Sequence, residues 1–224
     1  MLTISTFNIK NDQSSNKHTY IKKYLLDNKI DILNLQEVYP LCAKKLEKNL
    51  VGYKMTGDYR YLAIPHINES NPIITNKNII STKTYRLPHF PALLNRIITK
   101  TVINIADKNV TVFNTHLDYK YESVKIRQLN FILKLVEKEE NPIILTGDFN
   151  LKNNKKAFND FVAKMEKLNI YRVPIAEKTF KPSKYKRAID HIFLSKEFKL
   201  LNKRVVKDIN TSDHYPVLVE VLFK

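Results

Sequence analysis

Two short segments in the C-terminal part of the chain carry side chains that phosphoester hydrolysis needs. Thr-Gly-Asp-Phe-Asn occupies residues 146–150, and Ser-Asp-His-Tyr-Pro occupies residues 212–216. Each lies beside a run of Ile, Leu and Val, so each is expected to place a carboxylate at a strand edge, next to an amide or an imidazole. Carboxylate and amide oxygens can hold a divalent cation, and histidine can move a proton at neutral pH. The two segments therefore indicate metal-assisted hydrolysis of a phosphoester.

Polar residues at the ends of other apolar runs add candidates for the same chemistry. Phosphoester cleavage requires a cation that neutralises charge, a base that activates water, and a donor that assists the leaving oxygen. Residues of these kinds at expected strand ends are Asn8, Gln36, Glu37, His116, Asp118, Asp148, Asn150, Asp190, His191, Asp213 and His214. Together they make a complete set for a hydrolase.

The segments that would position these residues alternate between strand-like and helix-like patterns. Strands are expected at residues 2–9, 31–37, 72–81, 96–105, 109–117, 143–145, 188–194 and 215–223. Helices are expected at 17–29, from Pro40 onward, at 119–139 and at 154–168. No linker or internal repeat interrupts the chain, so we expect a single domain over residues 1–224. Its mixture of strand–helix units and hairpins predicts an α/β or α+β fold with mixed sheets.

Individual positions within these elements carry further expectations. The apolar faces of the first three helices are expected to include Leu26, Leu41 and Ile126, respectively. Asp107-Lys108-Asn109 predicts the turn of a hairpin. Gly147 is one of only three glycines, so we expect it where a Cβ atom would obstruct a turn or a close approach.

The charge of the chain indicates an anionic partner. Lys and Arg total 38 against 22 acidic residues, which gives a formal net charge of +16 over 224 residues. A field of this sign attracts polyanions and speeds their encounter with the protein, with nucleic acid as the first expectation and an anionic lipid surface as the second. The alternative is a charge that only keeps the protein soluble.

The cysteine count and the hydropathy pattern bear on the compartment. Cys42 is the only cysteine, which excludes intrachain disulfides and a metal site built on cysteine clusters. The first residues follow a strand pattern rather than that of a signal peptide, and no apolar run approaches the ~20 residues of a membrane span. We therefore expect a soluble cytoplasmic protein. The sequence does not indicate an oligomeric state.

The order of the polar motifs resembles the endonuclease/exonuclease/phosphatase superfamily. The matching motifs are Thr-Phe-Asn8, Leu-Gln-Glu37, Asn-Thr-His116-Leu, Gly-Asp148-Phe-Asn150, Ile-Asp190-His-Ile and Ser-Asp213-His214-Tyr-Pro-Val. This superfamily includes deoxyribonucleases, apurinic endonucleases, neutral sphingomyelinases, inositol-polyphosphate 5-phosphatases and tyrosyl-DNA phosphodiesterases. The resemblance implies a four-layered sandwich, in which two mixed β-sheets pack face to face with helices on both outer sides. It also implies a site at one sandwich edge and dependence on Mg²⁺ or Mn²⁺.

The same resemblance implies the metal ligands. Glu37 resembles the principal ligand, Asn8 lies beside it, and Asp213 would lie on the metal side. The alternatives are a solvated strand-end acid for Glu37 and a polar turn before the last strand for Asp213.

The resemblance also implies the residues that act on water and phosphate. Asp148 would lie close to the attacking water, and Asn150 would orient the phosphate. His214 would be the general base, oriented by Asp190. The alternative for residues 148–150 is an ordinary Asx turn after a strand.

Three further residues have less direct assignments. In the superfamily the residue matching His116 contacts the scissile phosphate and assists the leaving group, and Glu69 would pair with this histidine. His191 adjoins Asp190 but should point to the opposite face of the strand, which favours a structural role.

A basic segment leads into the Asp190 motif. Residues 178–187 hold the candidate nucleic-acid contacts Phe180, Lys181, Lys184, Tyr185, Lys186 and Arg187. Bases interleaved with aromatic residues can follow a phosphate backbone and stack nucleobases, although a solvated basic loop would have the same composition. Lys152, Lys155 and Lys156 offer a second basic patch.

These observations favour a metal-dependent nuclease that acts on DNA. The alternative within enzymes is a phosphatase or phospholipase that acts on a phosphoinositide, an inositol phosphate or sphingomyelin. His116 and the absence of Trp argue against the apurinic-endonuclease branch, and Lys186-Arg-Ala-Ile-Asp190 lacks the Cys-Asp-Arg signature of inositol 5-phosphatases. A third hypothesis is a catalytically silent module that binds nucleic acid.

Overall fold

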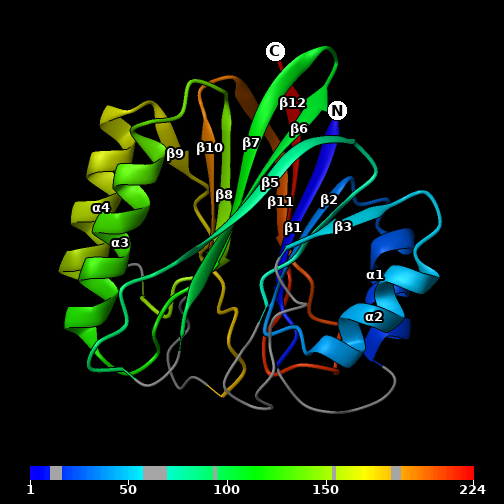
Figure 1. Ribbon diagram of the computed structural model, residues 1–224, viewed down its shortest axis with the longest axis horizontal. Coiled ribbons are helices and arrows are strands. Elements are labelled where there is room, and N and C mark those ends of the chain that lie inside the picture. The colour runs from blue at the N-terminus through cyan, green and yellow to red at the C-terminus, as the bar shows by residue number, and fades with distance from the viewer. Residues whose placement is uncertain (11–16, 58–69, 93–94, 153–154, 183–187) are drawn as a thin grey trace.

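Two β-sheets, each with six strands in the described part of the chain, form the centre of the molecule (Figure 1). The computed structural model describes residues 1–224 except 11–16, 58–69, 93–94, 153–154 and 183–187. The first sheet consists, in spatial order, of β11 (Phe198–Val205), β12 (Val217–Phe223), β1 (Leu2–Asn8), β2 (Ile32–Gln36), β4 (Ile73–Thr75) and β3 (Lys54–Thr56). The second consists of β5 (Asn78–Arg86), β6 (Ile97–Ile105), β7 (Lys108–His116), β8 (Ile143–Asp148), β10 (Asp190–Ser195) and β9 (Ile170–Arg172).

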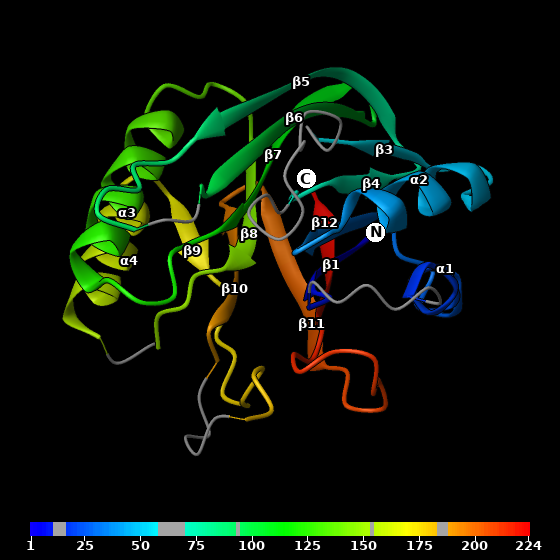
Figure 2. The ribbon, with the colours of Figure 1, turned by 60° about the horizontal axis from the view of Figure 1, so that its bottom comes forward.

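Two pairs of helices cover the outer faces of the sheets. Figure 2 shows α1 (Lys17–Asp27) and α2 (Pro40–Asn49) on the side of the first sheet, and α3 (Glu122–Val136) and α4 (Lys156–Lys167) on the side of the second. The result is a helix–sheet–sheet–helix sandwich, which confirms the predicted four layers. No helix among the described residues is long and apolar enough to cross a membrane.

Three apolar clusters hold these layers together. Ile4 and Val219 from the first sheet meet Val112 and Ile144 from the second in the central cluster. The two outer clusters lie under α1 and α2 and under α3 and α4. Because both faces of each sheet are covered, β2 and β8 are buried along their whole length. This burial explains why such strands occur in the sequence as continuous apolar runs rather than as alternating patterns.

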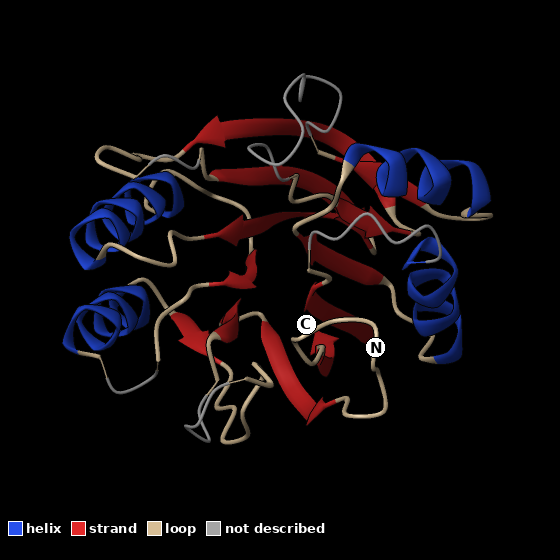
Figure 3. Cartoon of the chain, turned by 90° about the horizontal axis from the view of Figure 1, so that it is seen from below, coloured by secondary structure: helices blue, strands red, loops and turns tan. Residues whose placement is uncertain are grey.

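The pairing of the strands brings the polar residues to one edge of the sandwich. β1 and β2 are parallel, with Asn8 opposite Gln36, and β7 and β8 are parallel, with His116 opposite Asp148. β10 runs antiparallel to β8 and starts with Asp190 opposite Asp148. Because parallel strands end at the same side of a sheet, residues more than a hundred positions apart meet there. Figure 3 shows this edge of the sandwich from below.

The expectation of one strand over residues 72–81 is wrong. The segment forms β4 in the first sheet and the start of β5 in the second. Between them, the Asn76 backbone N–H and the Lys77 side chain both bind Asp31, at 3.3 Å and 2.7 Å. These contacts turn the chain out of the first sheet, and apolar periodicity alone does not show this turn.

Several finer expectations also differ from the structure. Leu26, Leu41 and Ile126 are exposed. The buried positions of α1 and α2 instead include Leu25 and Leu46, and Leu26 and Leu41 lie on the opposite sides of these helices. The hairpin turn lies at Ala106 and Asp107, which both have positive φ, rather than at residues 107–109. The short strands β3 and β9 and the mostly exposed edge strand β11 had no clear apolar pattern and were not expected.

Candidate active site

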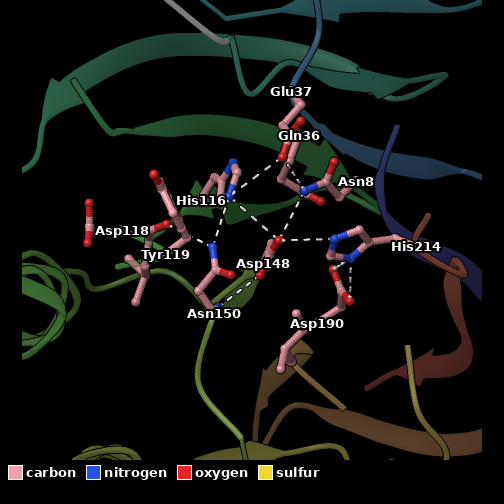
Figure 4. Close-up of polar contacts among 12 residues, drawn as sticks. Asn8, Gln36, Glu37, His116, Asp118, Tyr119, Asp148, Asn150, Asp190 and His214 are labelled. Atoms are coloured by element: carbon pink, nitrogen blue, oxygen red, sulfur yellow. Dashed lines mark hydrogen bonds and ion pairs between the residues drawn. The ribbon is translucent and has the colours of Figure 1, made fainter. Parts of the chain in front are cut away.

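The polar residues at the edge of the sandwich form one connected cluster (Figure 4). Asn8 and Glu37 come from the first sheet, His116 and Asp148 come from the second, and His214 precedes β12. Below them, Gln36 donates to Asn114 Oδ1 at 2.6 Å and thereby ties the two sheets together. Asn114 was not among the expected polar residues, although it stands two positions before His116 on the same side of β7.

Asn8 holds two carboxylates at a short distance from each other. Its Nδ2 donates to Glu37 Oε1 at 2.9 Å and to Asp148 Oδ2 at 3.0 Å, while its Oδ1 accepts from the Lys10 backbone N–H. Glu37 has a φ of +59°, a left-handed conformation directly after β2. In this structure, therefore, Asn8 presents its amide nitrogen to the acidic groups, not its oxygen.

His214 lies between two buried aspartates. Its Nδ1 is 3.0 Å from Asp190 Oδ2, and its Nε2 is 3.6 Å from Asp148 Oδ2. Ser212 fixes the backbone nearby, because its Oγ donates to the Asn8 carbonyl and accepts from the His214 N–H. Burial by itself would lower the pKa of His214, but Asp190 and Asp148 outweigh this effect and raise the pKa to about 10.

His116 is buried on the other side of Asp148. Its Nε2 lies 3.5 Å from Asp148 Oδ2 and 3.9 Å from Glu37 Oε1. Its Nδ1 lies 2.9 Å from Nη1 of Arg96, a buried arginine that sequence reasoning missed. The available signal was an arginine at the start of an expected strand, which was assigned no role. Glu69, the expected partner of His116, lies outside the described residues.

Asn150 is positioned by its own backbone and by three neighbouring groups. It has a φ of +49°, and its N–H donates to Asp148 Oδ1 at 2.8 Å, as in an Asx turn. Its Nδ2 donates to the Leu117 carbonyl and lies 3.1 Å from His116 Nε2. The turn that was an alternative to a functional role is therefore present, and it aims the Asn150 amide into the cluster.

The acidic groups fit a hard divalent cation. Asp148 is buried, and in the described part of the chain its ion-pair partners are histidines rather than Lys or Arg. Glu37 and Asp148, joined by the Asn8 amide, thus bring carboxylate oxygens to one place, as Mg²⁺ and Mn²⁺ sites require. One ligand atom from each of Asp148, Asp190 and His214 also lies within 4.8 Å of the others.

Asp213 lies apart from these groups. Its Oδ2 is 3.9 Å from Lys10 Nζ, its side chain is partly exposed, and it is not one of the three residues whose ligand atoms cluster. The structure thus leaves this predicted ligand at the rim of the site.

In the described part of the basic segment, Phe180 and Lys181 contact residues of the site and of the loop before it. Phe180 packs against His214, with ring centroids 4.8 Å apart. Lys181 Nζ donates to the carbonyls of Ile209 and Ser212, both at 2.6 Å, and lies over the Tyr215 ring. Burial lowers the pKa of Lys181, and Asp213 opposes this shift. Lys184, Tyr185, Lys186 and Arg187 lie outside the described residues.

Two other polar residues of the expected set have structural contacts. His191 is buried on the opposite face of β10, where it lies 4.4 Å from the Phe158 ring and its Nε2 lies 3.1 Å from the Leu151 carbonyl. Asp118 Oδ1 accepts from the backbone N–H groups of Lys120 and Tyr121, so α3 begins only at Glu122.

Comparisons with known proteins agree with this architecture. A family model described as the endonuclease/exonuclease/phosphatase family matches residues 5–214. No curated protein matches the chain.

Solved structures of different activities have the same fold. A mannosyl-6-phosphatase from Bacteroides thetaiotaomicron has a TM-score of 0.84 at 22% identity, with both chains covered completely. The catalytic domain of human nocturnin has a TM-score of 0.79 at 18% identity, over 100% of this chain and 93% of that one. TDP2 from D. rerio, complexed with a single-stranded DNA product, has a TM-score of 0.77 at 17% identity, over 99% of this chain and 98% of that one. At these identities the likeness shows the fold alone.

Proposed function

Because this chain belongs to the endonuclease/exonuclease/phosphatase family, and is thus a phosphoesterase with a divalent-metal site, we propose that it is a Mg²⁺-dependent nuclease that hydrolyses phosphodiester bonds in DNA. The observation that carries this proposal is the buried arrangement of Asp190, His214 and Asp148 beside Glu37 and His116. The net charge of +16 favours a polyanionic substrate.

His214 is the general base in this proposal. Asp190 accepts the Nδ1–H of His214, so in the neutral imidazole Nε2 is the nitrogen that takes the proton from the attacking water. Asp190 and Asp148 raise the pKa of His214, and a cation held by Asp148 would oppose that rise and favour the neutral imidazole. Nε2 faces Asp148, so Asp148 Oδ2 marks the side from which the water attacks. The pair therefore supplies both a proton acceptor and its orientation.

His116 and Asn150 face the phosphate. Their Nε2 and Nδ2 atoms lie 3.1 Å apart, so oxygens of one phosphate group could contact both side chains in place of the contact between them. Arg96 supports His116 from behind. Such preorganised donors stabilise the charge that develops in the transition state.

Glu37 and Asp148, with Asn8 between them, would hold the cation. When bound, Mg²⁺ supplies charge neutralisation at the phosphate oxygens. Asp213, at the edge of the site beside Lys10, is proposed to lie near the ion without contacting it directly.

The test is cleavage of supercoiled plasmid with Mg²⁺, with EDTA, and with His214→Ala protein. We expect nicking that requires Mg²⁺ and is absent in the variant, while the thermal melting of the variant shows a folded protein. Absence of nicking by folded wild-type protein would contradict a DNA endonuclease. Hydrolysis of a phosphoinositide or an inositol phosphate in the same buffer would then establish the phosphatase alternative, and metal-independent DNA binding without any hydrolysis would establish a silent binding module.

A further inference from the structure

Two aromatic side chains project into solvent from the segment that follows His116 and from the segment that precedes Arg96. Tyr119 is 61% exposed and follows His116 by three positions. Phe90 is 82% exposed and lies in the segment between β5 and β6, which ends at Arg96. Exposing large aromatic surface to water is unfavourable, so aromatic residues near a site are candidates for contact with a ligand.

The position of Tyr119 is fixed by Lys125 of α3. Lys125 Nζ donates to the Tyr119 carbonyl at 3.0 Å and to the Asn150 carbonyl at 3.2 Å. The two carbonyl groups therefore lie close together, and Figure 4 shows Tyr119 on the His116 and Asn150 side of the cluster. Because Lys125 is a buried cation, its contacts hold this loop firmly against the loop that follows β8.

The segment that carries Phe90 is fixed to the same helix. Arg127 donates to the Phe90 carbonyl, and Gln128 Nε2 donates to the Pro88 carbonyl at 3.0 Å. Gln128 Oε1 in turn accepts from the Asp118 N–H at 2.8 Å. The N-terminal half of α3 thus holds both loops, and the backbones beneath both aromatic side chains are anchored.

The charge around these residues suits a polyanion. Lys120 is exposed beside Tyr119, with its Nζ 5.1 Å from the Tyr121 ring. The nearby acid Glu122 pairs with Lys155 at 3.8 Å, and Asp118 is buried in backbone contacts. The exposed surface therefore combines aromatic faces with basic groups.

We propose that Phe90 and Tyr119 form an aromatic rim that stacks unpaired nucleobases next to the scissile phosphate, on the His116 side. This inference rests on the proposed nuclease function and adds a preference for unpaired bases, such as those of single strands or frayed ends. Aromatic faces stack on every base, whereas in a duplex the base faces are already covered. The basic groups beside the rim favour a polynucleotide over a neutral sugar ring, which could also pack on an aromatic face.

The experiment compares two single-stranded substrates of equal length and charge. One is a normal oligonucleotide, and the other carries abasic sites on both sides of the central phosphate. The variants are Phe90→Ala, Tyr119→Ala and the double variant. Tyr171→Ala is the matched control, because Tyr171 is an exposed tyrosine paired with Leu194 in β10, four residues from the site end of that strand.

We expect wild-type protein to bind and cleave the normal oligonucleotide at least tenfold better than the abasic one, because bases that stack on aromatic side chains add to the affinity. The double variant should lose this preference through a higher KM, and Tyr171→Ala should keep it. If the double variant changed KM equally for both substrates, or changed it for neither, the proposal of an aromatic rim would be overturned.

Failure of the rim and failure of the nuclease function are separable. Binding of both oligonucleotides is also measured with His214→Ala protein, which needs no turnover. A preference for the base-bearing strand that disappears when Tyr119→Ala and Phe90→Ala are added supports the rim even without cleavage. Absence of that preference, together with binding of a phosphosugar that Tyr119→Ala weakens, would assign the rim to a sugar and overturn the proposal.

Discussion

The orientation of the His214 ring depends on the carboxylate of Asp190. Asp190 lies 3.0 Å from His214 Nδ1 and is the first residue of β10, so a regular strand holds it in place. In the neutral imidazole, this contact selects the tautomer whose Nε2 can accept a proton. Asp148, on the Nε2 side, then defines where the water must lie.

Replacing Asp190 with Asn should remove the negative charge beside His214 while keeping a side chain of the same shape. The amide preserves the shape but no longer favours the correct tautomer, so we expect kcat to fall about 10²- to 10⁴-fold with little change in KM. Steady-state kinetics with a phosphodiester substrate would check this, with circular dichroism as the control for folding. A variant with wild-type kcat would show that Asp190 does not orient the base.

The pKa of His191 is shifted in the opposite direction to that of His214. Burial lowers the pKa of His191 to about 3, although the backbone contact with Leu151 opposes the shift. The folded protein therefore holds the neutral form, while the unfolded chain takes up a proton below its usual pKa of ~6.5. The stability contributed by His191 is present above pH ~6.5 and is lost as the pH falls towards 3.

This behaviour predicts a pH-dependent difference between wild-type protein and His191→Gln. Urea unfolding at pH 7, 5 and 4 should show that wild-type protein loses stability more steeply than the variant. The variant itself should be less stable at pH 7 by about 1–3 kcal/mol, since its side chain packs less well on Phe158. Parallel pH curves for the two proteins would mean that His191 titrates normally.

At the level of elements, the site depends on the close approach of β7 and β8. Gly147 stands opposite Thr115 in this parallel pair. A Cβ atom at Gly147, where φ is +153°, would lie 2.0 Å from the Thr115 carbonyl oxygen. His116 and Asp148 are the next residues of the two strands, so the absence of a side chain at Gly147 sets their separation.

Gly147→Ala is expected to destabilise the protein by about 3 kcal/mol or more, because backbone atoms must move to admit the methyl group. Gly52→Ala is the matched control: Gly52 also has positive φ, at +78°, but nothing lies within 4 Å of the added Cβ. The control should cost about 1 kcal/mol. Chemical denaturation measures both, and similar losses for the two variants would refute the steric argument.

For the whole molecule, the charge of +16 should determine how binding depends on salt. Each phosphate neutralised by a lysine or an arginine releases counterions, so the affinity for a polyanion falls as salt rises. Between 50 and 200 mM NaCl we expect affinity for a DNA oligonucleotide to fall by at least about tenfold. Fluorescence anisotropy with His214→Ala protein would measure this without turnover. An affinity that does not change with salt would mean that the charge has no part in binding.

Lys181 shows why charge alone could not identify the contacting residues. Sequence composition placed it in a basic segment, but its ammonium group donates to two carbonyls of the loop before His214. Lys125, in contrast, occurs on a helix face and yet lies buried beside Asn150. A lysine's role depends on which groups surround it, and those groups come from distant segments.

Local patterns in the sequence predicted most of the long strands and helices, the family and the candidate catalytic residues, but not β3, β9 or β11. Hydrophobic periodicity reports which side of an element is buried, so the long strands and helices were predictable. The motifs around His116, Asp148 and His214 can be identified as short local patterns. In each, a carboxylate, an amide or an imidazole lies next to a strand end.

The way in which these groups face one another follows from the packing of the two sheets. The pairing of β7 with β8 placed Asp148 beside His116, and the packing of the two sheets brought His214, from the segment before β12, to the other side of Asp148. Arg96, directly before β6, reaches His116 from a third segment. Such contacts join residues that are far apart in the chain, and no local pattern encodes the distance between them. Hydrophobic periodicity shows which residues are buried. Catalysis depends on the distances between the catalytic atoms, and these distances are set by how the strands and sheets pack.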